Sequence, residues 1–286
     1  MHNPLNNLGS RIVGARLHLG IASDGIAMSR YESAWDRKPV LVGEITCATH
    51  DLTQSCETLL QNSNCRGLPL AISLGHGWGK LFIVRPPSQV QKKSVLVAAA
   101  AMRYQSLFGK SNEAYQIEAD WQLDRPFLAC AYPKSLLATL HKIAQQNQSP
   151  LLAIVPCFVA AWNTWRDQIT AESWLGVINN NFLAIGITAD THPLDLAEIR
   201  NISIPATGHN FEWLDELLRR AALQHNVAIP KKISLIGNQH RYWHQPDISK
   251  TNQFITNLDN FVSITSPNQT VHVSAALQLL ACGIAI

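Results

Sequence analysis

The chain has 286 residues, of which 47% are hydrophobic and 15% are charged, and its formal net charge is +3. This length and hydrophobic content suffice to bury one large core or two moderate ones, which argues against a disordered protein and predicts two lobes. The basic residues are scattered apart from short pairs. A nucleic-acid groove normally shows a dense basic stripe with interleaved aromatic residues, so we expect no nucleic-acid partner.

Neither a signal peptide nor a membrane span is expected. The segment 1–10 is short and polar and lacks the charged, apolar and cleavage regions of a secretory leader. The longest apolar stretch, Val271–Ile286, contains polar residues and falls short of the roughly 20 residues that span a bilayer. We therefore expect a buried helix over 271–286.

The six cysteines occur without any C-x-x-C pair, which indicates reduced thiols and a cytoplasmic protein. Cys47, Cys56 and Cys65 are evenly spaced, but a structural zinc site usually has a fourth ligand and short paired spacing. We therefore expect no metal site at these cysteines.

Hydrophobic periodicity and the positions of Gly and Pro predict an alternation of strands and helices. The expected strands cover 15–22, 25–31, 40–46, 69–74, 80–84, 115–123, 127–131, 151–155, 174–178, 182–188, 199–204, 233–236 and 261–265. The expected helices cover 51–61, 88–108, 133–146, a segment that opens at Pro156, 210–224 and 271–286. The glycine-rich Gly75–Gly79 is expected to close a hairpin, because a Walker phosphate loop would continue with Ser or Thr and a helix.

An internal repeat is the most informative feature of this pattern. Three strands followed by a helix occur twice along the chain, although the two copies share little identity. Such a repeat predicts a duplicated, two-lobed α/β plan.

Eight short segments resemble, in the same order, those of a known family. They are Leu17–Ile26, Leu68–Leu74, Leu81–Pro87, Tyr115–Trp121, Phe127–Ala131, Pro156–Asn163, Ile233–Gly237 and Val273–Gly283. The order of elements resembles the actin/Hsp70-like ATPase fold. Within that fold it resembles the PilM-like proteins of type IV pilus assembly, with their relatives in type II secretion and the mannose-sensitive pilus. The resemblance spans nearly the whole chain, from Arg11 to Ile286.

The resemblance implies an α/β, two-lobed actin/Hsp70-like (RNase H-like) fold with an inserted subdomain. The first lobe would cover 11–150 and include the inserted subdomain at about 68–132, and the C-terminal helix 271–286 would pack back on it. The second lobe would cover 151–270.

The resemblance also implies where the nucleotide loops would lie. The candidate residues are Gly20, Ser23, Asp24 and Gly25 in the first phosphate loop, Asn179, Asn180 and Asn181 in the second, and Gly237 in the adenosine loop. His18 stands where the family has an acidic residue, the Asn run replaces an acidic-x-Gly turn, and Asn238 follows Gly237 where a second glycine is expected. Magnesium and water are organised by carboxylates, which Asn and His do not replace. We therefore expect no cofactor, or ATP and magnesium if nucleotide binding is retained.

The function implied by the resemblance is that of a cytoplasmic scaffold, a pseudo-ATPase, in a type IV pilus or type II secretion-like platform. It would lie at the inner membrane through its partner, by binding the cytoplasmic tail of a single-span assembly protein. Self-association is an open expectation. The alternative is an active ATP-binding enzyme of the same fold, in which Asp24 and Asn179–Asn181 would act around magnesium.

His240 and His244 lie four residues apart, with Asp247 nearby, which is a metal-ligand spacing if the segment is helical. Pro246 makes a full helical turn doubtful, so we expect an aromatic loop, which can equally serve as a partner contact. The tryptophans Trp162, Trp165 and Trp174 are expected in the core.

Overall fold

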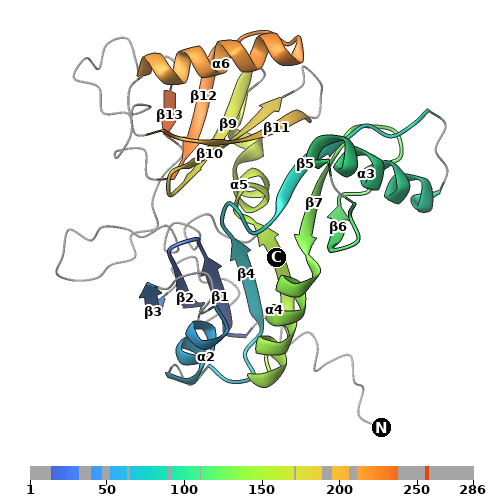
Figure 1. The fold of residues 1–286 in the computed structure, drawn as a ribbon. Coiled ribbons are helices and arrows are strands. Elements are labelled where there is room, and N and C mark those ends of the chain that lie inside the picture. The colour runs from blue at the N-terminus through green and yellow to red at the C-terminus, as the bar shows by residue number, and fades with distance from the viewer. Residues whose placement is uncertain are drawn as a thin grey trace. The chain divides into compact units, whose positions relative to one another are not determined.

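The computed structural model describes residues 14–31, 40–46, 52–62, 65–88, 92–109, 111–170, 172–188, 195–205, 211–237 and 255–257. They form an α/β fold in which two sheets have five strands and one has three (Figure 1). Contacts divide the chain into one unit of Met1–His76, Leu137–Ala160 and Asn260–Ile286, and a second of Gly77–Leu136 and Ala161–Asp259. This division groups 77–136 with the second sheet, whereas the expected first lobe contains that segment. The domain boundaries given above stay a prediction.

The first unit is built on a mixed five-stranded sheet in the order β3-β2-β1-β4-β8. Its elements are β1 (Arg16–Ile21), β2 (Gly25–Tyr31), β3 (Val40–Thr46), α2 (Leu52–Asn62), β4 (Leu70–Leu74), most of α4 (Lys134–Gln146) and β8 (Leu151–Pro156). Because side chains alternate along a strand, Leu19 of β1 shares one face with its β2 partner Met28 and with Gly43 of β3. Helix α2 covers this face, since a Cβ built on Gly43 would lie 2.9 Å from Leu59 Cδ2.

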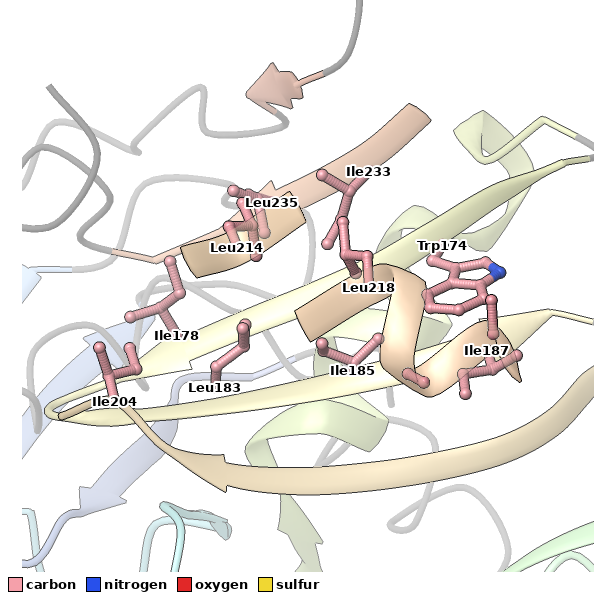
Figure 2. Close-up of a cluster of buried hydrophobic side chains, with 12 residues drawn as sticks. Trp174, Ile178, Leu183, Ile185, Ile187, Ile204, Leu214, Leu218, Ile233 and Leu235 are labelled. Carbon is pink, nitrogen blue, oxygen red and sulfur yellow. The ribbon is translucent and has the colours of Figure 1, made fainter. Parts of the chain in front are cut away.

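The second unit contains a five-stranded sheet in the order β11-β10-β9-β12-β13. Its elements are β9 (Ser173–Asn179), β10 (Phe182–Thr188), β11 (Leu196–Ser203), α6 (Phe211–His225), β12 (Lys232–Ile236) and β13 (Ile255–Asn257). Helix α6 buries an apolar stripe that includes Leu214 and Leu218 against Trp174, Leu183 and Ile185 of the sheet (Figure 2). Burial of this stripe is the main contribution that stabilises α6, because helices in proteins are stabilised chiefly by burial of one apolar face.

The two five-stranded sheets have the same strand order when their strands are numbered along the chain. In each, a two-residue hairpin joins the first two strands, and the central strand pairs in parallel with a later one. The predicted internal repeat is therefore confirmed at the level of topology.

The inserted subdomain, residues 77–136 of the second unit, has its own antiparallel sheet in the order β5-β7-β6. Its elements are β5 (Lys80–Val84), α3 (Lys93–Phe108), β6 (Tyr115–Ala119) and β7 (Phe127–Pro133). Helix α3 packs Leu96, Ala100 and Tyr104 into a core with Phe82 and other residues of this sheet. The helix ends at Gly109, whose left-handed φ of 64° and N–H bond to the Gln105 carbonyl terminate it as expected.

The expected hairpin at Gly75–Gly79 is wrong. Strand β4 pairs with β1 and β8 in the first sheet, whereas β5 pairs with β7 in the inserted sheet. All five residues of β4 are buried, and such a strand belongs in the middle of a sheet, between two partners. The glycine-rich segment instead carries the chain from the first unit to the second, with Gly77 at a φ of 94°.

Other expectations differ in smaller ways. Helix α3 begins at Lys93 instead of residue 88, and β13 was missed. Helix α5 (Cys157–Trp165) follows Pro156 directly, as expected. The expected strand 261–265 and helix 271–286 lie outside the described residues. Within the described part of the chain, no helix is both long and apolar enough to cross a membrane.

Candidate functional site

The first candidate loop is the hairpin between β1 and β2. The N–H of Ala22 donates a 2.9 Å hydrogen bond to the carbonyl of Gly25, which closes the hairpin. Ser23 and Asp24 therefore form an exposed two-residue turn. Gly20 lies inside β1 and is buried. A Cβ at Gly25 would lie 2.8 Å from the Ile45 carbonyl oxygen, so this position accepts only glycine without movement of β3.

His18 does not lie in the turn. It sits in the middle of β1, 2% exposed, and its Nε2 lies 2.8 Å from Ser73 Oγ of β4. Burial, with a smaller contribution from the Arg16 charge, lowers the pKa of His18 to about 3. The ring is therefore neutral at physiological pH and supplies neither negative charge for magnesium nor a proton for catalysis.

The polar environment of His18 is not required by the fold. Its Nδ1 and the hydroxyl of Ser29, the residue opposite it on β2, are both buried and have no hydrogen-bond partner among the described residues. Counted back from the residues that close the two equivalent hairpins, His18 of the first sheet corresponds to Leu175 of the second, whose β10 partner is Gly186. The same place in the repeated topology is thus apolar, which marks the polar group around His18 as a local feature of the first sheet.

The second candidate loop is the hairpin between β9 and β10. Asn179 pairs with Phe182, so Asn180 and Asn181 form the turn, with Asn180 at a φ of 56°. Asparagine tolerates this left-handed conformation better than most residues, as the sequence predicted. The side chain of Asn179 is buried, and Asn181 is exposed.

Gly237 lies next to this loop. It ends β12 at a φ of 108°, and a Cβ there would lie 2.1 Å from the carbonyl oxygen of Ile178, the residue before Asn179. The fold therefore brings the Asn turn and Gly237 together where β9 and β12 of the second sheet end. Gly20, Ser23, Asp24 and Gly25 lie together on the first sheet. These two groups belong to different units, and their role in nucleotide binding stays a prediction.

The metal hypotheses find no support in the described residues. No group of three or more His, Cys, Asp or Glu side chains is arranged there to hold a metal ion. Cys56 and Cys65 are both buried. Cys47 and the motif from His240 to His244 lie outside the described residues, as does Asn238.

Sequence analysis missed a charged cluster on β11. Glu198 is 6% exposed, and its Oε2 lies 3.3 Å from Arg103 Nη2 of α3 and 4.0 Å from His225 Nδ1 of α6. Burial lowers the pKa of His225, the charges of Arg200, Arg85 and Arg103 act in the same direction, and Glu198 opposes them. No short-range signal could have identified Glu198, because one charged residue between apolar neighbours is also the pattern of a solvent-facing strand position.

A second feature that was missed is an aromatic group around Lys80 at the start of β5. Its Nζ lies 4.5 Å from the ring centre of Phe108, 5.4 Å from that of Tyr115 and 5.6 Å from that of Tyr104. An ammonium group at these distances is attracted to the ring faces. The contact ties β5 to α3 and β6 within the inserted subdomain.

Comparison with known proteins identifies the fold. No protein-family model matches the chain, and no curated protein is significantly similar in sequence. Among solved structures, a chain of the PilM–PilN type IV pilus biogenesis complex superposes with a TM-score of 0.62 at 10% identity, over 95% of this chain and 98% of that one.

Two further solved structures agree with this result. A Bacteroides thetaiotaomicron protein of actin-like ATPase fold and unknown function gives a TM-score of 0.56 at 11% identity, over 80% of this chain and 84% of that one. The cytoplasmic domain of EpsL, an inner-membrane component of the Vibrio cholerae type II secretion system, gives 0.54 at 8% identity, over 93% of each chain. At such low identities the similarity shows the fold alone. The duplicated sheets and these superpositions together establish that the chain has the actin-like ATPase fold.

Proposed function

We propose that this protein is a scaffold of a type IV pilus or type II secretion-like assembly platform. In this role it binds the cytoplasmic tail of a single-span inner-membrane protein, lies at the cytoplasmic face of that membrane through this partner, and turns over little or no ATP.

The observation that carries the proposal is the extent of the similarity to the PilM–PilN complex. The superposition covers 95% of this chain and 98% of that one, so it includes the inserted subdomain and not only the two five-stranded sheets. The cytoplasmic domain of EpsL matches over a similar extent. Both solved structures come from assembly systems, and one of them is a complex.

The candidate loops support a scaffold over an ATPase. In the first turn only Asp24 carries a carboxylate, and it is exposed, while the second turn consists of Asn180 and Asn181. Magnesium in nucleotide sites is held by carboxylates together with the phosphates of the substrate. The rival, an active ATP-binding enzyme, therefore depends on Asp24.

The inserted subdomain is the proposed contact region for the tail. Helix α3 buries one side against its own sheet and exposes Val95, Ala98 and Met102 on the other, with Met102 65% exposed. These residues are spaced by three and four positions, so they lie on one face of the helix. An apolar face of this kind suits the apolar anchor residues of a short peptide.

The proposal is tested by titrating the chain, in a calorimeter, with synthetic peptides that tile the cytoplasmic tails of single-span membrane proteins encoded beside its gene. The proposal is supported if a peptide binds the wild type and if the Met102→Asp variant no longer binds it. The matched control is Leu223→Asp on α6, which is 83% exposed and lies outside the inserted subdomain, and which should leave binding unchanged. Absence of binding by every peptide contradicts the scaffold role.

A parallel titration with ATP and magnesium decides between scaffold and enzyme. Phosphate release that is abolished by Asp24→Ala would support the enzyme and overturn the proposal. Binding of ATP without release of phosphate, or no binding of ATP, agrees with the scaffold role.

A further inference from the structure

The described residues of the second unit include two hydrophobic clusters. One lies between α6 and its sheet and contains Trp174, Leu214 and Leu218. The other lies between α3 and the inserted sheet and contains Phe82 and Tyr104. The two sets share no residue among those described, although β5 of the inserted sheet and β11 of the other sheet contact each other (Figure 1). Each body therefore has its own source of apolar stability.

The contact between these two bodies includes polar bonds from three arginines of the inserted subdomain. Arg103 Nη2 lies 3.3 Å from Glu198 Oε2, and Arg125 Nη1 lies 3.2 Å from Asp195 Oδ1. Arg85 Nη2 donates a 3.3 Å hydrogen bond to the carbonyl of Ala197. All three acceptors lie within four consecutive residues at the start of β11, which is an edge strand.

The geometry fixes Arg103 more firmly than an ordinary surface arginine. Its Nε donates a 3.3 Å hydrogen bond to the Ile83 carbonyl of β5, while its Nη2 contacts Glu198. The Arg103 side chain is 32% exposed, and the Glu198 side chain is 8% exposed. Glu198 also accepts a 3.2 Å hydrogen bond from the N–H of Ile199 at its other oxygen, Oε1. The buried carboxylate of Glu198 is thus bonded both within β11 and to α3 of the inserted subdomain. We call this contact between the two bodies the joint.

From the separate cores and this charged contact we propose that the inserted subdomain is latched to the edge of β11 by Arg85, Arg103 and Arg125, and that it detaches as a folded body when the latch is broken. Apolar packing resists separation in any salt, whereas ion pairs with partly exposed guanidinium groups are screened by salt. High ionic strength should therefore weaken this joint more than it weakens either core. This inference does not depend on the proposed function.

Hydrogen–deuterium exchange of the full chain tests the latch directly. The variant Asp195→Asn with Glu198→Gln removes both acidic acceptors and keeps side-chain shape. Peptides that cover 80–85 and 195–199 should then exchange several-fold faster, because both strand edges become accessible to water. Peptides from the central strands β7 and β9 should keep their protection, because neither core is changed.

The matched control is Asp215→Asn with Glu216→Gln on α6. It removes the same number of negative charges and breaks two ion pairs, to Arg219 and Arg220, that lie away from the joint. It should leave exchange at 80–85 and 195–199 unchanged.

Salt supplies an independent readout. Raising it from about 0.05 to about 1 M should speed exchange at the joint in the wild type and have little effect there in the double variant, since the screened ion pairs are already absent. Two results would overturn the latch. One is wild-type protection of the joint in the variant. The other is loss of protection in β7 and β9 together with the joint, which would mean that the two bodies unfold as one.

Discussion

The Nε2 atom of His18 is hydrogen-bonded to Ser73 Oγ at 2.8 Å, inside a sheet whose repeated counterpart is apolar at the same place. Burial lowers the pKa of His18 to about 3, well below its usual 6.5. His18 therefore links the stability of the first unit to pH.

The pH dependence follows from the direction of this shift. The unfolded chain binds the His18 proton near pH 6.5 and the folded chain only near pH 3, so stability is lost as pH falls below about 6.5. Between pH 7 and pH 5 the loss is about 2 kcal/mol. The variant His18→Leu with Ser73→Ala should lose this part of the pH dependence in urea unfolding at the two pH values. An unchanged difference between pH 7 and pH 5 in the variant would contradict the assignment to His18.

Two glycines with left-handed backbone should respond differently to substitution by alanine. Gly237→Ala places a Cβ 2.1 Å from the Ile178 carbonyl oxygen and should destabilise the protein by about 3 kcal/mol or more. Gly77→Ala meets no atom within 4 Å and should cost only the backbone strain, about 1 kcal/mol. Urea unfolding of both variants checks the order. Equal losses would show that the contact with Ile178 is not what selects glycine at 237.

The ion pair between Arg103 and Glu198 should be asymmetric to mutation. Arg103→Gln leaves the carboxylate of Glu198 buried without its ion-pair partner from α3, and should cost about 3 kcal/mol. Glu198→Gln leaves a guanidinium that is 32% exposed and can be hydrated, and should cost about 1 kcal/mol. Thermal or urea unfolding measures both, and the reverse order would mean that Glu198 is not the member that depends on its partner.

Helix α6 offers a matched pair of leucines. Leu218 is fully buried against the sheet (Figure 2), and Leu218→Ala should cost about 2–5 kcal/mol through lost burial and the remaining cavity. Leu223 is 83% exposed, and Leu223→Ala should change stability by no more than about 0.5 kcal/mol. Both variants keep helix propensity nearly the same, so a similar loss in both would contradict the placement of the α6 apolar face.

Local features of the chain were predictable where a short segment decides its own conformation. The strands Gly25–Tyr31, Val40–Thr46 and Phe182–Thr188 have the bounds that the sequence indicated, because hydrophobic side chains and turn residues mark both ends. The turn at Asn180 and the helix end at Gly109 were also expected, since each depends on the backbone conformation that one residue tolerates.

Strand pairing was less predictable because its partners are distant in sequence. Strands β4 and β5 are neighbours along the chain and were expected to form a hairpin, yet β4 pairs with β1 and β8. The repeat still indicated the correct fold class, because two equivalent runs of elements need equivalent sheets. The candidate nucleotide residues stay a prediction, since what they can hold depends on chemistry that the turns alone do not define.

The sequence by itself thus determined most of the elements, the duplicated α/β plan and the turn at Asn180, which are set by residues close together along the chain. Only the tertiary structure decided that His18 is buried and neutral and that Glu198 is held by Arg103. In both cases the reason is the same: the energy of a polar or charged group depends on burial and on partners from other elements. Ser73 is distant from His18 in the sequence, as Arg103 is from Glu198, and folding alone brings them together.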